Sequence, residues 1–359
     1  MPRLFQFSHN ISLPPLQTAV KVWCFASIAD TKNMPFGDVQ ERPIADRATT
    51  LAERLQPRIA VEQHFARIGH TYRHGKAFRF FENKMMRPGL SMGLRLCGLY
   101  EQGRQNSLRP QVVEITLSYP NLPSSFDGFR VLHLSDFHID GVDGLAETLV
   151  PLLVRINPDL CVFTGDYRFE DRGSCAAVYP RMQRVINSIS AQDGIYGILG
   201  NHDSAEIAYG LEALGIRMLV NENMEIRRGG DSLWLVGVDD PFDYHCADLD
   251  AALAGVPANG FKILLAHAPE VYQAAAAQGV DLYLSGHTHA GQIRLPIVGS
   301  IKHNSHCPKE YSHGLWKHGN MRGYTTSGIG CSSVPVRYHC PPEIVIFQLK
   351  RGNEAVEQS

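Results

Sequence analysis

The sequence contains no apolar run long enough to cross a membrane. A transmembrane helix needs about 20 consecutive apolar residues, and polar residues interrupt every apolar stretch of this 359-residue chain before that length. The first residues, MPRLFQFSHNISLPP, also lack the basic-then-apolar order of a secretory signal. We therefore expect a cytoplasmic protein that is soluble or attached only peripherally to the inner face of the membrane.

Cysteine pairs with CxxC spacing are also missing, although the chain has eight cysteines. Their spacing is irregular, and a chain of this length can form a full core without disulfide bonds. We expect reduced thiols, while the even count leaves disulfides open as the alternative. The cysteines are Cys24, Cys97, Cys161, Cys175, Cys246, Cys307, Cys331 and Cys340.

A strong net charge is absent as well, since the formal charge is −2. The charges are unevenly distributed, because residues 1–110 contain 16 Lys and Arg against 8 Asp and Glu, and the remainder contains 18 against 28. The basic part suits an anionic surface or substrate, and the acidic part suits metal binding. Because the isoelectric point is near neutral and no nucleic-acid module is recognisable, we expect no nucleic-acid partner.

Internal repeats are absent, and the apolar pattern changes along the chain. Residues 50–105 have helical spacing, and residues 112–120 alternate as a strand does. From residue 129, short apolar runs end in polar residues and alternate with helical segments, which predicts an α/β (α+β) fold. The strand EIVIFQLK is expected to close the sheet. We expect a basic, partly helical extension (1–110), one domain (111–350) and a flexible tail (351–359).

Polar motifs follow the first two of these apolar runs. Asp136 and His138 lie two residues apart after VLHLS, so in an extended segment both side chains point to the same side. Gly165 and Asp166 follow LCVFT; the glycine permits close backbone approach, and the carboxylate can bridge two cations. Alone, the first motif resembles many accidental surface pairs and the second an ordinary turn.

A third motif, Gly200-Asn201-His202-Asp203, follows GIYGIL. The Asn201 amide oxygen is a neutral hard ligand, and His202 could act as an acid steadied by Asp203. The alternative is a turn with a helix N-cap at Asp203 or Ser204.

Histidines supply the last two motifs. His267 follows FKILLA, and a lone histidine at a strand end is more often structural. In Gly286-His287-Thr288-His289, two imidazoles lie two residues apart, a pattern typical of ligands for Zn, Mn or Fe. Together the motifs predict a site for two divalent metal ions with open positions for water and substrate. The candidate ligands are Asp136, His138, Asp166, Asn201, His267, His287 and His289.

The motifs DxH, GD, GNHD, H and GHTH, in this order, resemble the calcineurin-like metallophosphoesterase superfamily over residues 129–350. The resemblance implies two packed β-sheets flanked by helices, and hydrolysis of a phosphate ester or diphosphate by a metal-activated hydroxide. It implies one ion at Asp136, His138 and His289, another at Asn201, His267 and His287, and Asp166 bridging both. It also implies that His202 is a general acid or transition-state contact, and we expect Asp203 to fix its tautomer.

Narrower features resemble one branch of that superfamily. GHTHAGQIRLP (286–296) and residues 327–349 are similar to bacterial membrane-associated phosphodiesterases and to one type of UDP-2,3-diacylglucosamine pyrophosphatase, an enzyme of lipid A biosynthesis. Residues 73–106 resemble the helical extension of that type. Within them we expect Arg79, Arg87 and Arg95 to bind a lipid-linked substrate or an anionic membrane.

Three alternatives stay open. The basic helices could simply pack on the domain as a solvated pair. The substrate could be a soluble nucleotide or a phosphoprotein. The chain could also be a non-catalytic scaffold, although a complete ligand set with His202 argues against this.

Overall fold

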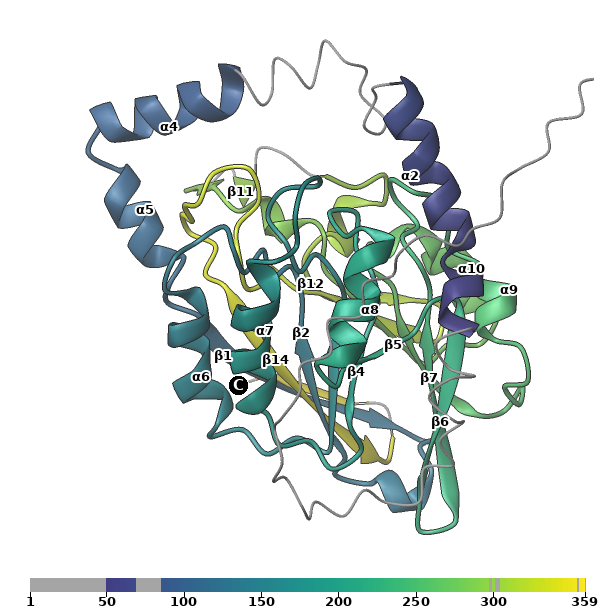
Figure 1. Cartoon of the computed structure of the whole chain (residues 1–359). Coiled ribbons are helices and arrows are strands. Elements are labelled where there is room, and N and C mark those ends of the chain that lie inside the picture. Colours follow the sequence, from purple (N-terminus) through teal and green to yellow (C-terminus); the bar gives the residue numbers. More distant parts are fainter. Residues whose placement is uncertain (1–49, 69–84, 297–298, 301–303, 354, 359) are drawn as a thin grey trace, which may run out of the picture. The chain divides into compact units, whose positions relative to one another are not determined.

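The apolar runs of the sequence form two β-sheets (Figure 1). The structure is a computed structural model that describes residues 50–68, 85–296, 299–300, 304–353 and 355–358. The first sheet has the order β15-β1-β14-β2-β3-β4-β5, and the second has the order β12-β13-β9-β8-β7-β6. The predicted fold class, two packed sheets flanked by helices, is confirmed.

The strands are short and mostly buried. Those of the first sheet are β1 (Gln111–Tyr119), β2 (Arg130–Leu134), β3 (Leu160–Phe163), β4 (Ile195–Gly197), β5 (Arg217–Met218), β14 (Glu343–Arg351) and β15 (Ala355–Gln358). Those of the second are β6 (Glu222–Arg228), β7 (Asp231–Gly237), β8 (Phe261–Leu265), β9 (Leu282–Ser285), β12 (Gly314–His318) and β13 (Met321–Thr325). A small separate pair joins β10 (Arg294–Leu295) and β11 (Gly299–Ser300).

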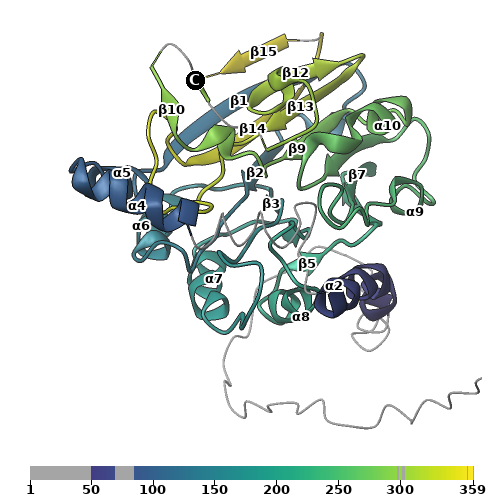
Figure 2. The same cartoon turned by 90° about the horizontal axis from the view of Figure 1, so that it is seen from above.

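Helices cover the outer faces of both sheets (Figure 2). The described α-helices are α2 (Gln56–Ile68), α4 (Arg87–Leu96), α5 (Tyr100–Asn106), α6 (Leu145–Leu153), α7 (Val178–Asn187), α8 (Ala205–Ala213), α9 (Leu249–Ala252) and α10 (Tyr272–Ala277). The shorter 3-10 turns are η2 (Ser124–Phe126), η3 (Pro269–Val271), η4 (His289–Gly291) and η5 (Lys309–Tyr311). Among the described residues, no helix combines the length and apolarity that a membrane crossing requires.

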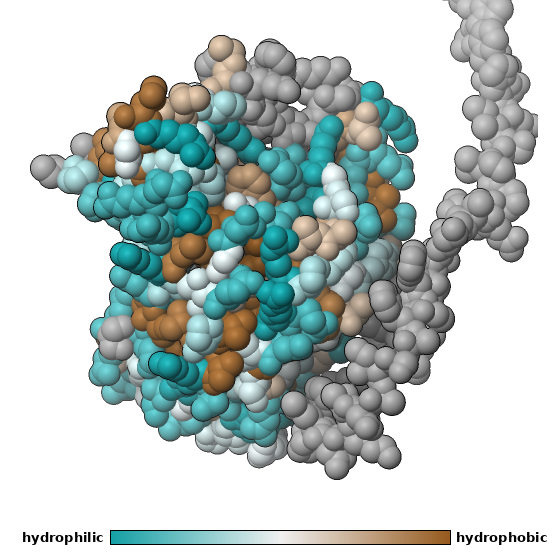
Figure 3. Space-filling model, turned by 60° about the vertical axis from the view of Figure 1, so that its left-hand side comes forward, coloured by the Kyte–Doolittle hydropathy of each residue, from teal (hydrophilic) through white to brown (hydrophobic). Residues whose placement is uncertain are grey.

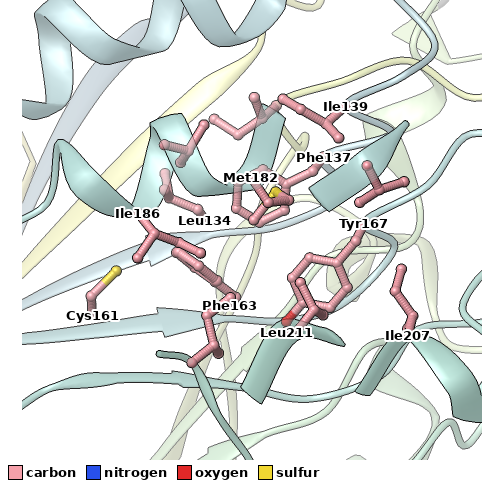
Figure 4. Packing of buried hydrophobic residues seen from close by; sticks show 14 of the residues in the cluster. Leu134, Phe137, Ile139, Cys161, Phe163, Tyr167, Met182, Ile186, Ile207 and Leu211 are labelled. Carbon is pink, nitrogen blue, oxygen red and sulfur yellow. The ribbon is translucent and has the colours of Figure 1, made fainter. Parts of the chain in front are cut away.

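Alternate side chains of each central strand enter different cores. In β3, Leu160 and Val162 pack between the two sheets, whereas Cys161 and Phe163 pack against α6, α7 and α8. Figure 4 shows the helix-side cluster, in which the Phe137 and Tyr167 rings stack with centroids 5.6 Å apart. Both rings come from the segments that carry candidate ligands, so the core anchors those segments at the edge of the sheet.

Three features differ from the sequence expectation. The strand that was expected to close the sheet, β14, lies inside it between β1 and β2 and is buried along most of its length. Residues of the expected flexible tail form β15, which pairs antiparallel with β1. The sequence pattern also did not predict the hairpins β6–β7 and β12–β13, because polar residues interrupt their apolar alternation.

The seven cysteines within the described residues are free thiols, as expected for a reduced protein. Cys24 lies outside the described residues.

Buried His133 on β2 should make stability depend on pH. Its Nε2 hydrogen-bonds Thr164 Oγ1 at 2.9 Å, and burial lowers the pKa of His133 from 6.5 to about 3. Because the folded-state pKa is depressed, this contribution is full above the unfolded pKa and is lost as pH falls from 6.5 towards 3. We expect a loss of roughly 2–3 kcal/mol by about pH 4.5.

The measurement is urea unfolding of the parent and of His133→Gln across that range. Glutamine keeps a nitrogen donor for Thr164 and does not titrate. The free energy of unfolding of the His133→Gln variant should therefore fall less steeply in acid than that of the parent. Parallel profiles of the two proteins would show that His133 does not carry this dependence.

Candidate metal centre

The candidate ligands all follow strands whose carboxyl ends meet at one edge of the two sheets. β2, β3 and β4 run parallel to one another, as do β7, β8 and β9. Ligands gather at the carboxyl ends of parallel strands, because the loops that leave neighbouring strands converge there. The structure brings all seven predicted ligand residues together at this edge.

One group of side chains surrounds His138. Its Nε2 lies 3.1 Å from His289 Nε2 and 3.5 Å from Asp166 Oδ2. His289 Nε2 lies 3.3 Å from Asp136 Oδ1. Asp136, His138 and His289 are buried and place ligand atoms within 4.8 Å of one another, a geometry that can hold a metal ion.

A second group surrounds His267. Its Nε2 lies 3.3 Å from Asp166 Oδ2 and 3.1 Å from Asn201 Oδ1. Asn201 Oδ1 also lies 2.9 Å from His287 Nδ1. Asp166 therefore takes part in both groups through a single carboxylate.

Hydrogen bonds on the outer side of the rings orient two imidazoles towards the centre. His138 Nδ1 donates to the Arg168 carbonyl at 2.7 Å, and His267 Nδ1 donates to the Thr164 carbonyl at 2.6 Å. Nε2 of His138 then faces the Asp166 carboxylate, and Nε2 of His267 faces that carboxylate and the Asn201 amide oxygen. Such outer bonds fix the tautomer of metal-binding histidines, so this donor set fits divalent cations.

Electrostatics also favour positive charge at the centre. Although burial opposes it, the carboxylates of Asp166, Asp136 and Asp240 raise the pKa of His267 to about 10. Burial also acts against ionisation of Asp166, yet the neighbouring His267 and His202 rings bring its pKa well below the usual value. A proton on His267 thus balances the negative charge of these carboxylates, which a bound metal cation would also balance.

The backbone at the ligands adopts a conformation that is uncommon for side chains other than glycine. Five of the seven have positive φ angles: Asp136 (51°), His138 (36°), Asp166 (57°), His287 (69°) and His289 (48°). Left-handed conformations at non-glycine residues cluster at functional sites, where the surrounding packing enforces them. This backbone lets ligands two residues apart, Asp136 with His138 and His287 with His289, point their side chains towards the same centre.

Glycines allow the ligand loops to approach closely. A Cβ at Gly165 would lie 2.4 Å from the Gly200 nitrogen, and one at Gly286 would lie 2.1 Å from Asp136 Oδ2. Because neither contact is sterically possible, only glycine fits at these two positions.

His202 lies beside the His138 group. Its ring centroid is 4.7 Å from that of His138, and its backbone nitrogen donates to Asp166 Oδ1 at 2.8 Å. His202 Nδ1 donates to the Phe169 carbonyl at 2.7 Å. Burial lowers the pKa of His202 to about 3, so its ring is neutral at pH 7.

Asp203 does not orient His202, so that prediction was wrong. The buried Asp203 carboxylate accepts from the backbone nitrogens of Asp166, Tyr167 and Gly200 at 2.8–2.9 Å. The Phe169 carbonyl fixes the tautomer of His202 instead. Asp203 joins the Gly165-Asp166 loop to the Gly200-Asn201 loop, because its two oxygens accept from backbone amides of both.

Sequence reasoning missed three carboxylates that follow β7. Asp239 and Asp240 are buried, and Asp240 accepts from the backbone nitrogens of residues 242–244. This turn places Asp243 so that its Oδ2 accepts from Asn201 Nδ2 at 2.9 Å. The run LWLVGVDD (233–240) has the same apolar-then-polar pattern as the other motifs and could have revealed them.

The segment that follows β13 closes the other side of the centre. Arg337 is fully buried and donates to the carbonyls of Gly328 and Gly330. The Gly330 nitrogen donates to the Asp136 carbonyl at 2.7 Å, and Arg337 Nη2 lies 3.4 Å from His289 Nδ1. Arg337 thus holds this segment against two candidate ligands.

Two of the three arginines that were expected to bind substrate, Arg87 and Arg95, lie within the described residues, on α4. Arg87 is near the loop that holds His202, since its guanidinium carbon lies 5.9 Å from the Phe169 ring centroid. Arg95 stacks over Tyr100 at 3.7 Å on α4–α5. Arg79 lies outside the described residues.

Comparison with known proteins agrees with this geometry. The family model of the calcineurin-like phosphoesterases matches residues 129–291. An uncharacterized metallophosphoesterase of Bacillus subtilis, YkuE, is 32% identical over 267 residues, which cover 70% of this chain and 90% of that protein. The Escherichia coli phosphodiesterase YaeI is 29% identical over 233 residues, covering 62% and 82%. A Danio rerio transmembrane protein with a metallophosphoesterase domain is 30% identical over 263 residues, covering 68% and 58%.

The chain belongs to the calcineurin-like metallophosphoesterase family. It is a metal-dependent phosphoester hydrolase, and the clustered histidines and aspartates at the strand ends are its candidate metal-binding residues.

Proposed function

We propose that the protein hydrolyses a phosphodiester or diphosphate at a centre of two divalent ions, of Mn, Zn or Fe. The observation that carries this proposal is the shared position of Asp166, whose Oδ2 lies 3.5 Å from His138 Nε2 and 3.3 Å from His267 Nε2. In the proposal, Asp136, His138 and His289 would hold one ion, Asn201, His267 and His287 would hold the other, and the Asp166 carboxylate would be shared between them.

When bound, two such ions would supply a water of lowered pKa and would polarise the phosphoryl oxygens. The chain's own residues provide orientation and proton transfer. Asp243 accepts from the Asn201 amide nitrogen, which turns the amide oxygen of Asn201 towards His267 and His287. His202 Nδ1 is held by the Phe169 carbonyl at the margin of the centre, and the ring can protonate a leaving oxygen from Nε2 once Nε2 has taken up a proton on approach of the anionic phosphate.

For the substrate, we propose a lipid-linked diphosphate or phosphodiester such as UDP-2,3-diacylglucosamine, taken from the cytoplasmic face of a membrane. The support is the apolar surface of α4 and its flanks. Figure 3 shows the side of the molecule that carries this surface, with hydrophobic residues in brown. None of the residues of α4 is buried, and Leu96 is 81% exposed. The exposed apolar residues are Met85, Met86, Leu90, Met92, Leu96 and Leu99.

The composition of α4 supports a membrane surface as the partner of this apolar side. The helix RPGLSMGLRL contains two glycines, which disfavour a helix in water, so contact with another surface would stabilise it. It has two arginines and no acidic residue. A helix with exposed apolar residues and only positive charges suits an anionic lipid interface.

Replacing Arg87 and Arg95 by glutamine should weaken use of a lipid substrate. Each basic residue near an anionic surface contributes about 1 kcal/mol, so we expect KM for UDP-2,3-diacylglucosamine in phosphatidylglycerol vesicles to rise about 10- to 30-fold. Hydrolysis of a small aryl phosphodiester should change little, because the metal ligands lie on other segments. The measurement is a kinetic comparison of both substrates with Mn²⁺, with and without vesicles.

The matched control is Arg181→Gln with Arg184→Gln, which removes the same charge from α7 and should leave both substrates unaffected. A parent that cleaves soluble nucleotides or phosphoproteins but not the lipid would show that the substrate is water-soluble. An unchanged lipid KM in the Arg87/Arg95 variant would mean that α4 is only structural. Absence of Mn²⁺-dependent turnover of every substrate would favour a scaffold.

A further inference from the structure

Helix α2 contributes a fully buried arginine beside the loop that carries Asn201 and His202. Arg58 Nη1 donates to the Asp203 carbonyl at 2.6 Å, and Nη1 and Nη2 both donate to the Gly200 carbonyl at 3.2 Å. These carbonyls flank Asn201 and His202 on both sides. Figure 2 shows α2 beside α8, the helix that begins directly after this loop.

The same guanidinium also holds the loop that orients the Asn201 amide. Arg58 Nε and Nη2 donate to Asp239 Oδ1 at 2.9 and 2.6 Å. Asp239 begins the turn that places Asp243 against Asn201 Nδ2. Arg58 therefore fixes both the backbone on either side of Asn201 and the partner of its side chain.

Other contacts keep α2 in this position. Glu62 Oε1 accepts from the Ala205 nitrogen at 2.8 Å, at the start of α8. The Arg58 guanidinium stacks over the Tyr244 ring at 3.8 Å, and Tyr244 Oη donates to the Asp203 carbonyl at 3.3 Å. A planar guanidinium with several fixed donors suits this task, whereas an ammonium group cannot reach two carbonyls and a carboxylate in one plane.

We propose that Arg58 is a positioning residue of the active site, and that α2, which precedes the phosphoesterase domain in sequence, completes the site by aligning Asn201 and His202. This inference rests on the proposed function. A misalignment of about 1 Å can cost about 100-fold in rate. Loss of Arg58 should therefore weaken the ion held by Asn201 and reduce kcat, while the ion held by Asp136, His138 and His289 remains.

The test compares Arg58→Met, Arg58→Lys and the double variant Arg58→Met/Asp239→Asn in the full chain. The single Met change leaves the Asp239 carboxylate buried without its partner, which destabilises the fold by itself. The Asn change removes that charge but keeps an acceptor for the Asp240 nitrogen. The double variant should therefore recover thermal stability without recovering activity. Arg67→Met, an exposed change on the same helix, is the control.

The readouts are Mn²⁺ bound per chain, kcat, KM and the melting temperature. We expect the double variant to bind about one Mn²⁺ instead of two and to lose about 100-fold in kcat with little change in KM. Arg58→Lys should lie between it and the parent. Recovery of both ions and kcat along with stability would overturn the inference, since Arg58 would then act only on folding.

The parent protein separates this inference from the proposed function. A parent that binds two Mn²⁺ but hydrolyses none of the substrates contradicts the proposed function, while the loss of one ion in the variant would still support Arg58 as a positioning residue. A parent that binds no Mn²⁺ overturns both.

Discussion

Asp166→Ala should release both ions of the proposed two-metal centre and abolish turnover. Its carboxylate lies within 3.5 Å of a candidate ligand nitrogen in each of the two groups. Removing it also leaves the neighbouring imidazoles without the negative charge that raises the pKa of His267. The fall in kcat/KM should exceed the roughly 10²–10³-fold that follows loss of a single transition-state contact.

The measurement is metal content per chain after dialysis against Mn²⁺, together with the rate on an aryl phosphodiester. Asp143→Ala is the control, because its carboxylate is 94% exposed and is not among the candidate ligands. Circular dichroism should confirm that both variants fold. Two ions retained in Asp166→Ala would show that this residue does not bridge them.

His202→Ala should keep both ions of the proposed two-metal centre and slow the reaction. The ring is not among the seven proposed ligands, although it lies close enough to His138 and Asp166 to join them in a possible metal-binding group. General acid catalysis contributes about 10²–10⁴-fold. We expect a loss of that size for alkyl leaving groups, which need a proton most, and a smaller loss for aryl ones.

The low pKa of His202 means that the ring must gain a proton before it can act as an acid. Burial lowers that pKa to about 3, so the ring must take up a proton when the anionic phosphate approaches and raises it. Equal losses for aryl and alkyl substrates would exclude an acid role and leave only charge stabilisation. Loss of a metal ion would make His202 a ligand. His64→Ala, an exposed change on α2, is the control.

The sequence alone predicted the parts of the site that depend on local pattern. The side chains of an apolar run such as LCVF alternate between two cores, so the whole run is a buried strand. The polar residues that follow the run therefore lie at the end of that strand. Parallel strands then bring Asp136, Asp166 and His267 to one edge. For this reason the sequence predicted the seven candidate ligands and the fold class, and the resemblance of its motifs indicated the family.

Only the tertiary structure decided which groups surround those ligands. Asp203 is adjacent to His202 in sequence, yet its carboxylate faces three backbone amides, and the partner of His202 is the Phe169 carbonyl. Arg58 lies more than 140 positions before the loop that it holds. Strand order and side-chain pairing between distant segments depend on how the two sheets and α2 pack. Buried charges must find partners, and those partners come from anywhere in the molecule and not only from the same short stretch of sequence.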